Sequence, residues 1–254
     1  MSAPLLQLDK VTIRFGGLTA VCEVDLQIGE RELIGLIGPN GAGKTTLFNL
    51  ITGVYQPTGG TISFNGECTK CLKPHHLARR GIARTFQNIR LFASMSVFDN
   101  VRAAMQLHCA RGARNALWRG RAFCDGEKEI TAQVMALLEV FQLGRFRDES
   151  AKSLCYGDQR RLEIVRALAT KPKLLLLDEP AAGMNPSEKA ELMKLIQFIK
   201  DKFQIAVLLV EHDMKVVMGI CERIAVLDYG LKIAEGTSAE VRANPKVIEA
   251  YLGK

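Results

Sequence analysis

A glycine-rich segment limits the fold of this chain more than any other feature. It reads Gly38-Pro39-Asn40-Gly41-Ala42-Gly43-Lys44-Thr45-Thr46, with the apolar run LIGLI before it and the apolar stretch LFNLI after it. This strand, loop and helix order fits the phosphate-binding pattern G-x-x-x-x-G-K-S/T, whose glycines turn backbone N–H groups toward phosphate oxygens at a helix N-terminus. Lys44 can reach the β and γ phosphates, and the Thr45 hydroxyl can bind Mg²⁺. The segment therefore predicts a nucleotide site.

Two acids and a histidine follow two further apolar runs. Asp178 and Glu179 come directly after Leu174–Leu177, and His212 comes shortly after Ile205–Val210. In an open α/β sheet the ligand crevice lies beyond the carboxyl ends of the strands, so we expect these side chains to meet the glycine-rich loop. Asp178 can hold the Mg²⁺ shell, and Glu179 can polarise the water that attacks a phosphate. His212 is placed to sense the γ phosphate.

The alternation of short apolar runs with helix-length stretches predicts an α/β fold with a mainly parallel sheet. Residues Leu5–Phe15 and Val21–Ile28 alternate as strands do, and residues 59–66 read as a turn, a short strand and another turn, which indicates an antiparallel β portion. Helical spacing dominates from about Ser96 to Val165, which indicates a helical insertion. Residues 224–234 form a hairpin candidate before a helix-like tail.

Composition is typical of a globular cytosolic protein. The 254 residues are 48% hydrophobic, which is enough for a sizeable core. The longest apolar run, Ile205–Val210, is far shorter than the roughly 18 residues of a membrane-spanning helix, and the N-terminus shows no secretion signal. The seven cysteines are expected to be reduced thiols. The net charge of +7 suits an anionic partner, such as a nucleotide, nucleic acid or lipid surface, without choosing among them.

Several motifs occur in the order and at the spacing of one known family. They are the phosphate loop, Gln87 in RTFQ, the segment LCYGDQ that begins at Leu154, the Asp178-Glu179 pair and His212. Together they resemble the ATP-binding subunits of ABC transporters over essentially the whole chain. The stretches IRFGGL, GIARTFQ and QRRLEI and the ending from Asn244 to Gly253 resemble, more specifically, the LivG-type subunits of branched-chain amino acid importers.

This resemblance implies a single ABC ATPase domain over residues 1–254. A P-loop NTPase core of the RecA type, with the antiparallel β portion, would take residues 1–87 and 166–254. A helical subdomain would take residues 88–165, approximately.

The resemblance also implies roles for particular residues. Phe15 would stack on the adenine ring, and Gln87 would join the Mg²⁺ shell and report to the membrane subunit. Cys155 and Gly157 would meet the γ phosphate held by a partner ATPase, although the family usually has Ser at position 155. The loop that ends at Asn185 would cross the interface between the two ATPase subunits.

The implied function is an ATPase that uses ATP and Mg²⁺, dimerises with an identical or a related subunit, and drives a membrane permease from the cytoplasmic face of the membrane. A periplasmic or extracellular binding protein would deliver the cargo, a branched-chain or related hydrophobic amino acid, and nucleic acid would not be a partner. The ATPase subunit never touches the cargo, so amides, urea and lipid stay open as alternatives.

Two other classes of protein share a phosphate loop. A soluble ABC-type ATPase that acts on nucleic acid or ribosomes usually carries a large added domain or two cassettes, and 254 residues leave room for neither. A P-loop kinase for small molecules would have little use for the LCYGDQ segment or for His212.

Two local patterns have simpler explanations. Cys68, Cys71, His75 and His76 suggest a zinc site, but no second C-x-x-C pair accompanies them, so we expect ordinary reduced thiols. The segment Arg102–Cys124 is rich in arginine and holds the single tryptophan. We expect it to be a solvated face of the helical insertion, with contact to anionic lipid headgroups as the alternative.

Overall fold

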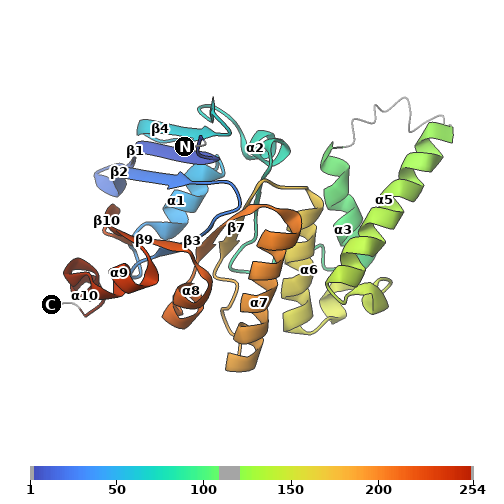
Figure 1. The fold of residues 1–254 in the computed structure, drawn as a ribbon. Coiled ribbons are helices and arrows are strands. Elements are labelled where there is room, and N and C mark those ends of the chain that lie inside the picture. The colour runs from blue at the N-terminus through green and yellow to red at the C-terminus, as the bar shows by residue number, and fades with distance from the viewer. Residues whose placement is uncertain (1–2, 109–120, 253–254) are drawn as a thin grey trace. The chain divides into compact units, whose positions relative to one another are not determined.

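A six-stranded sheet runs through one part of the chain, in the order β10-β9-β3-β8-β7-β6 (Figure 1). Its strands are β3 (Leu33–Ile37), β6 (Ile82–Arg84), β7 (Leu174–Asp178), β8 (Ala206–Val210), β9 (Arg223–Asp228) and β10 (Leu231–Gly236). Neighbouring strands are parallel, except that β10 is antiparallel to β9. The sheet confirms the mainly parallel α/β fold predicted from the sequence.

The computed structural model describes residues 3–108 and 121–252, and the chain divides into two units. The first unit takes residues 1–87 and 173–254, and the second takes residues 88–172. Helix α6 (Tyr156–Ala169) lies wholly in the second unit, and the division falls after this helix. Within the described ranges, no helix combines the length and the apolar character needed to cross a membrane.

The central strands β3, β7 and β8 are buried at every position. Parallel strands that are covered on both faces have continuous apolar sequences of this kind, which explains why their runs stand out in the sequence. The sequence does not reveal β6, because three residues are too short to show a pattern. Its place comes from parallel pairing with β7.

The antiparallel β portion is a four-stranded sheet in the order β2-β1-β4-β5. Its strands are β1 (Leu6–Phe15), β2 (Leu18–Ile28), β4 (Gly59–Phe64) and β5 (Glu67–Cys68). Leu6 pairs with Ile28 on one side and with Phe64 on the other, and all three side chains are buried. Buried and exposed positions alternate along β2, so this sheet has one apolar face.

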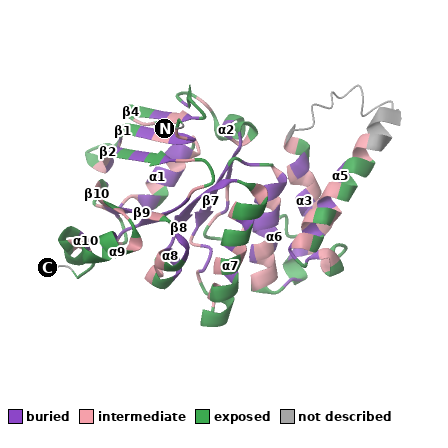
Figure 2. Ribbon diagram, in the orientation of Figure 1, coloured by how far each residue is buried: buried purple, intermediate pink, exposed green. Residues whose placement is uncertain are grey.

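One core joins the antiparallel sheet, helix α1 (Lys44–Ile51) and one face of the parallel sheet, as the buried positions in Figure 2 show. Phe48 of α1 is among its fully buried side chains. Helix α8 (Met214–Ile220) lies against β3, so close that a Cβ on Gly35 would be 2.6 Å from Val217 Cγ1. A larger residue than glycine at position 35 would push α8 away from the sheet. The strand that leads into the phosphate loop is thus tightly packed.

Further helices of the first unit are α2 (Pro74–Arg80), α7 (Pro186–Phe203), α9 (Ser238–Ala243) and α10 (Pro245–Leu252). Helix α7 begins with a capping box, in which Asn185 Oδ1 accepts from the Glu188 N–H at 3.0 Å and Glu188 Oε2 accepts from the Asn185 N–H at 2.8 Å. Such caps contribute about 1 kcal/mol each. This cap fixes the end of the loop that precedes α7.

The second unit is helical. Its main helices are α3 (Val97–Met105), α5 (Arg121–Val140) and α6, with short 3₁₀ turns η1 (Gln106–His108), η2 (Gly144–Phe146) and η3 (Ala151–Ser153). Arg160 and Glu163 of α6 form a buried ion pair at 2.8 Å. Breaking such a pair by removing one partner typically costs about 3–5 kcal/mol. Most of the arginine-rich segment 102–124 lies outside the described residues.

Candidate functional site

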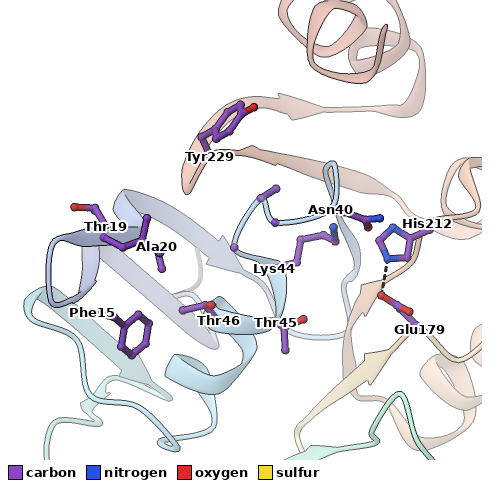
Figure 3. A pocket seen from close by; sticks show the side chains of 14 residues that line it. Phe15, Thr19, Ala20, Asn40, Lys44, Thr45, Thr46, Glu179, His212 and Tyr229 are labelled. Atoms are coloured by element: carbon purple, nitrogen blue, oxygen red, sulfur yellow. Dashed lines mark ion pairs between the residues drawn. The ribbon is translucent and has the colours of Figure 1, made fainter. Parts of the chain in front are cut away.

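A pocket of about 530 Å³ opens beside the glycine-rich loop in the first unit. It is lined by Phe15, Leu18, Thr19, Ala20, Asn40, Gly41, Ala42, Gly43, Lys44, Thr45, Thr46, Glu179, His212 and Tyr229. Figure 3 shows Lys44 near the centre, Phe15 on one side, and Glu179 with His212 on the other. The volume is within the range of about 300–1,000 Å³ that is usual for small-molecule sites. The loop and residues that follow β7 and β8 therefore line one pocket.

The backbone of the loop has a shape that glycine adopts without strain. Gly41 and Gly43 have φ angles of 82° and 98°, in the left-handed region. A Cβ on Gly43 would lie 2.6 Å from the carbonyl oxygen of Ala20. Helix α1 begins at the next residue, so the N–H groups of its first turn lie at the loop. This arrangement favours an anion such as phosphate.

The Lys44 side chain lies against the same loop. Its Nζ donates to the carbonyl oxygen of Gly38 at 2.7 Å and to that of Pro39 at 2.9 Å. Burial lowers the pKa of the Lys44 ammonium, and the negative charges of Glu179 and Asp178 oppose this change. An ammonium has three donor hydrogens, so the group that now bonds the loop is also suited to donate to phosphate oxygens.

Glu179 is held by two other segments of the first unit. Its φ of 47° lies in the left-handed region. Residues other than glycine rarely adopt this conformation, and those that do are often found at functional sites. Its N–H donates to the Val210 carbonyl oxygen at 2.9 Å, at the end of β8. Its Oε2 accepts from Gln87 Nε2 at 2.7 Å, and its Oε1 is 2.5 Å from His212 Nε2 (Figure 3). The structure thus brings Gln87, Glu179 and His212 together.

Asp178 forms a buried ion pair with Arg84, the last residue of β6. Arg84 Nη2 is 2.6 Å from Asp178 Oδ2, with the side chains 8% and 6% exposed. Arg84 Nη1 also donates to Asn49 Oδ1 of α1 at 2.7 Å. The guanidinium lies 5.4 Å and 5.1 Å from the ring centroids of Phe48 and Phe86. These contacts fix the Asp178 carboxylate at the end of β7 against β6 and α1.

The site offers oxygen atoms suited to Mg²⁺, which prefers carboxylates, hydroxyls and phosphates. Thr45 is exposed at the pocket wall, and Asp178 ends the neighbouring strand β7. Gln87, the third residue expected in the Mg²⁺ shell, donates its amide to Glu179 in this structure. In the described part of the chain, no three His, Cys, Asp or Glu side chains are grouped to hold a metal ion, at residues 68–76 or elsewhere. The donor set suits a Mg²⁺ ion that shares its shell with phosphates.

Phe15 lies at the far side of the pocket from His212 (Figure 3). It is 44% exposed, and the Tyr55 ring meets it edge to face, with centroids 5.2 Å apart and an angle of 72° between the planes. Such aromatic pairs contribute about 0.5–1.5 kcal/mol beyond burial and fix the orientation of the rings. Phe15 is thus an oriented, accessible aromatic ring that suits a flat base.

Comparison with known protein families decides the wider identity. The profile described as ABC transporter matches residues 21–182, which is more than half of the chain. The chain belongs to the ABC transporter family. A second profile, described as branched-chain amino acid ATP-binding cassette transporter, matches residues 232–254 of the cassette.

Relatives of the cassette match over its full length. It is 46% identical to the high-affinity branched-chain amino acid transport ATP-binding protein BraF of Pseudomonas aeruginosa, over 100% of both chains. It is 47% identical to LivG of Salmonella typhimurium, a protein with the same description, again over 100% of both. The structure of the ADP conformation of MJ1267, an ATP-binding cassette of an ABC transporter, is 30% identical with a TM-score of 0.85 over 100% of both chains. These matches confirm the ABC ATPase fold and the ATP-hydrolysing role predicted from the motifs.

Cys155 and Gly157 of the cassette lie in the second unit, at the start of α6. Cys155 has the N-cap position of this helix, and its Sγ donates to Asp158 Oδ2 at 3.2 Å. A Cβ on Gly157 would meet no atom within 4 Å. The expected contact of these two residues with the γ phosphate of a partner ATPase therefore stays a prediction.

The motifs do not identify every residue at the site of the cassette. Tyr229 lines the pocket and is 86% exposed, Arg84 pairs with Asp178, and Glu211 is buried next to His212. An acid at the end of a buried apolar run is the signal that identifies Asp178 and Glu179, and it applies equally to Glu211 after β8. The positions of Arg84 and Tyr229 depend on contacts between distant segments, so the local sequence carries no signal for them.

Proposed function

We propose that the cassette binds ATP in the pocket beside the phosphate loop, hydrolyses it with Glu179 as the water-orienting base, and powers uptake of branched-chain or related hydrophobic amino acids through a membrane permease. The observation that carries the proposal is the Glu179 carboxylate, held between Gln87 and His212 in the pocket that Lys44 also lines. A carboxylate fixed beside a phosphate cradle suits the orientation of water toward a γ phosphate.

The proposed reaction gives each of three residues one task. Lys44 turns its ammonium from the loop carbonyls toward the β and γ phosphate oxygens, where its charge stabilises the transition state. Glu179 accepts a hydrogen bond from the attacking water and receives its proton as the bond from the water oxygen to the γ phosphorus forms. The bond between the γ phosphorus and the bridging oxygen breaks in the same reaction, so ADP leaves and phosphate is released. His212 holds the Glu179 carboxylate from the opposite side to Gln87 and lies where it can also contact the γ phosphate.

Other residues position the nucleotide and its metal ion. Phe15 stacks on the adenine, supported at its edge by Tyr55. Thr45 and Asp178, together with Gln87, would hold Mg²⁺, which neutralises negative charge on the phosphates when it is bound. This assignment is supported by the oxygen atoms that Thr45 and Asp178 offer at the pocket and at the adjacent strand end.

Two cassettes work together in the proposed mechanism, as a homodimer or a heterodimer. Cys155 and Gly157 of one cassette meet the γ phosphate bound by the other, and backbone N–H groups at the start of α6 supply most of the stabilisation because a thiol is a weak donor. The loop of residues 182–185 crosses the interface. The capping box at Asn185, which fixes the end of this loop, supports a defined contact surface there.

The family makes the cassette a subunit of a transporter, and we place it at the cytoplasmic face of the membrane as a peripheral protein. The segment Asn88–Phe92 would contact the permease. Phe92 is 52% exposed, and the Arg166 guanidinium lies over its ring, with Arg166 Cζ 5.2 Å from the ring centroid of Phe92. An exposed aromatic side chain in the segment that follows Gln87 supports this contact.

The cargo assignment rests on the relatives, whose described cargo is branched-chain amino acids. The nucleotide site itself gives no information about cargo. Amides, urea, lipid or a role outside transport are therefore the outcomes that an experiment has to separate from amino-acid uptake.

Cargo should control ATP hydrolysis by the assembled transporter. We expect the ATPase rate of permease and cassette, reconstituted with the cognate binding protein, to rise when leucine, isoleucine or valine is added. The binding protein without amino acid, and the same mixture with a short amide or urea, serve as controls. Stimulation of the ATPase rate by urea or amides but not by leucine would contradict the cargo assignment. An ATPase rate that is the same with and without the permease and the binding protein would contradict the transport role.

A further inference from the structure

The carboxylate of Glu211 is buried between the loops that follow β7 and β8. Glu211 is only 4% exposed. One oxygen accepts from the Ala181 N–H at 2.6 Å, and the other accepts from the His212 N–H at 3.2 Å. The side chain thus bonds the backbone of both loops at once.

Burying this acid opposes its ionisation. Burial raises the pKa of the Glu211 carboxyl, the nearby charge of Glu179 raises it further, and the backbone N–H groups of Ala181, His212 and Asp213 oppose the rise. An aliphatic residue would avoid this cost in a strand end that is otherwise apolar. Natural proteins commonly retain such costly polar groups at functional sites.

The two loops carry the two side chains that must meet for the proposed reaction. Glu179 stands on the loop after β7 and His212 on the loop after β8, and their side chains meet at 2.5 Å. The paired strands end at Asp178 and Val210, and one further backbone bond joins Glu179 N–H to Val210. Beyond that bond, Glu211 links the backbone of the two loops.

We infer that Glu211 is a positioning residue, which fixes the backbone of His212 against the loop after β7 so that the imidazole meets the Glu179 carboxylate. This inference rests on the proposed function, because His212 and Glu179 receive their roles there. Glu211 does not line the pocket, so it acts on the reaction through these two residues.

Glu211→Gln tests this role with the smallest change in shape. An amide has one acceptor oxygen, so its NH₂ group would face one of the two backbone N–H donors. We expect kcat for ATP hydrolysis to fall by about 10–100-fold, since displacement of a catalytic pair by about 1 Å has such effects. The affinity for ATP should stay within about twofold of the wild-type value, because the variant loses stabilisation of the transition state and not of bound nucleotide.

Glu32→Gln is the matched control. Glu32 also accepts a backbone N–H, from Gly29 at 2.7 Å, and it pairs with Arg223, but it precedes β3 at the amino-terminal end of the sheet. We expect this variant to keep the wild-type kcat. Thermal unfolding of both variants shows whether they are folded at the assay temperature. If Glu211→Gln is not folded, Glu211→Asp, which shortens the side chain and keeps the carboxyl group, is assayed in its place with the same expectation.

A double-mutant cycle with His212→Ala tests whether Glu211 affects ATP hydrolysis through His212. If Glu211 acts through His212, the double variant should be hardly slower than His212→Ala alone in single-turnover hydrolysis, because the effects of coupled residues are not additive. An unchanged kcat, an ATP affinity that falls in step with kcat, or full additivity with His212→Ala would overturn the inference. If Glu179→Gln, assayed in parallel, is inactive while Glu211→Gln is fully active, only this inference fails. If Glu179→Gln is fully active, the proposed function itself fails.

Discussion

Glu179→Gln should leave ATP binding intact while ATP turnover falls by about 10²–10⁴-fold, the contribution typical of a positioned general base. The amide keeps the shape of the side chain and can still bond Gln87 or His212, but it cannot take a proton from water. Equilibrium binding of labelled ATP and steady-state hydrolysis measure the two effects separately. Glu249→Gln, the same change on an exposed position of α10, is the control and should hydrolyse ATP normally.

Blocked hydrolysis should also trap the dimer. With ATP and Mg²⁺, Glu179→Gln should accumulate as an ATP-bound dimer, detected by its mass in solution. Adding Gly157→Asp should remove that dimer, because a carboxylate at position 157 would face the γ phosphate bound by the partner. The fold should persist, because a Cβ at position 157 would meet no atom within 4 Å. Near wild-type turnover of Glu179→Gln would contradict its role as the base.

Lys44→Ala should abolish nucleotide binding or hydrolysis. The ammonium is the cation in the phosphate loop that can neutralise the β and γ oxygens, and loss of its charge-assisted bonds should reduce affinity or turnover by roughly 10²-fold or more. Titration with labelled ATP, followed by a hydrolysis assay, measures both quantities.

The matched control for Lys44→Ala is Lys246→Ala, at an exposed position of α10. It removes the same charge from the surface and should leave both quantities unchanged. If Lys44→Ala also keeps wild-type affinity and turnover, the glycine-rich loop is not the phosphate cradle of this cassette.

Features that are local in the sequence are the ones that can be predicted from it. The phosphate loop and Asp178-Glu179 stand directly beside strand patterns, and the sheet then brings the strand ends together. The buried pair of Arg84 and Asp178 joins residues 94 positions apart, through a three-residue strand that has no recognisable pattern. The bounds of the helical subdomain were predicted only approximately for a related reason, because the helical spacing of α6 continues past Val165 to Ala169.

Uptake and ATP consumption, measured in the same vesicles, test most directly the claim that this cassette drives transport. Proteoliposomes that contain the permease and the cassette would enclose ATP and Mg²⁺ on the side of the cassette, with labelled leucine and its binding protein outside. We expect leucine accumulation that needs the enclosed ATP, stops with Glu179→Gln and persists with Glu249→Gln. Accumulation at the wild-type rate with Glu179→Gln, or hydrolysis with no uptake of any branched-chain amino acid, would contradict that claim.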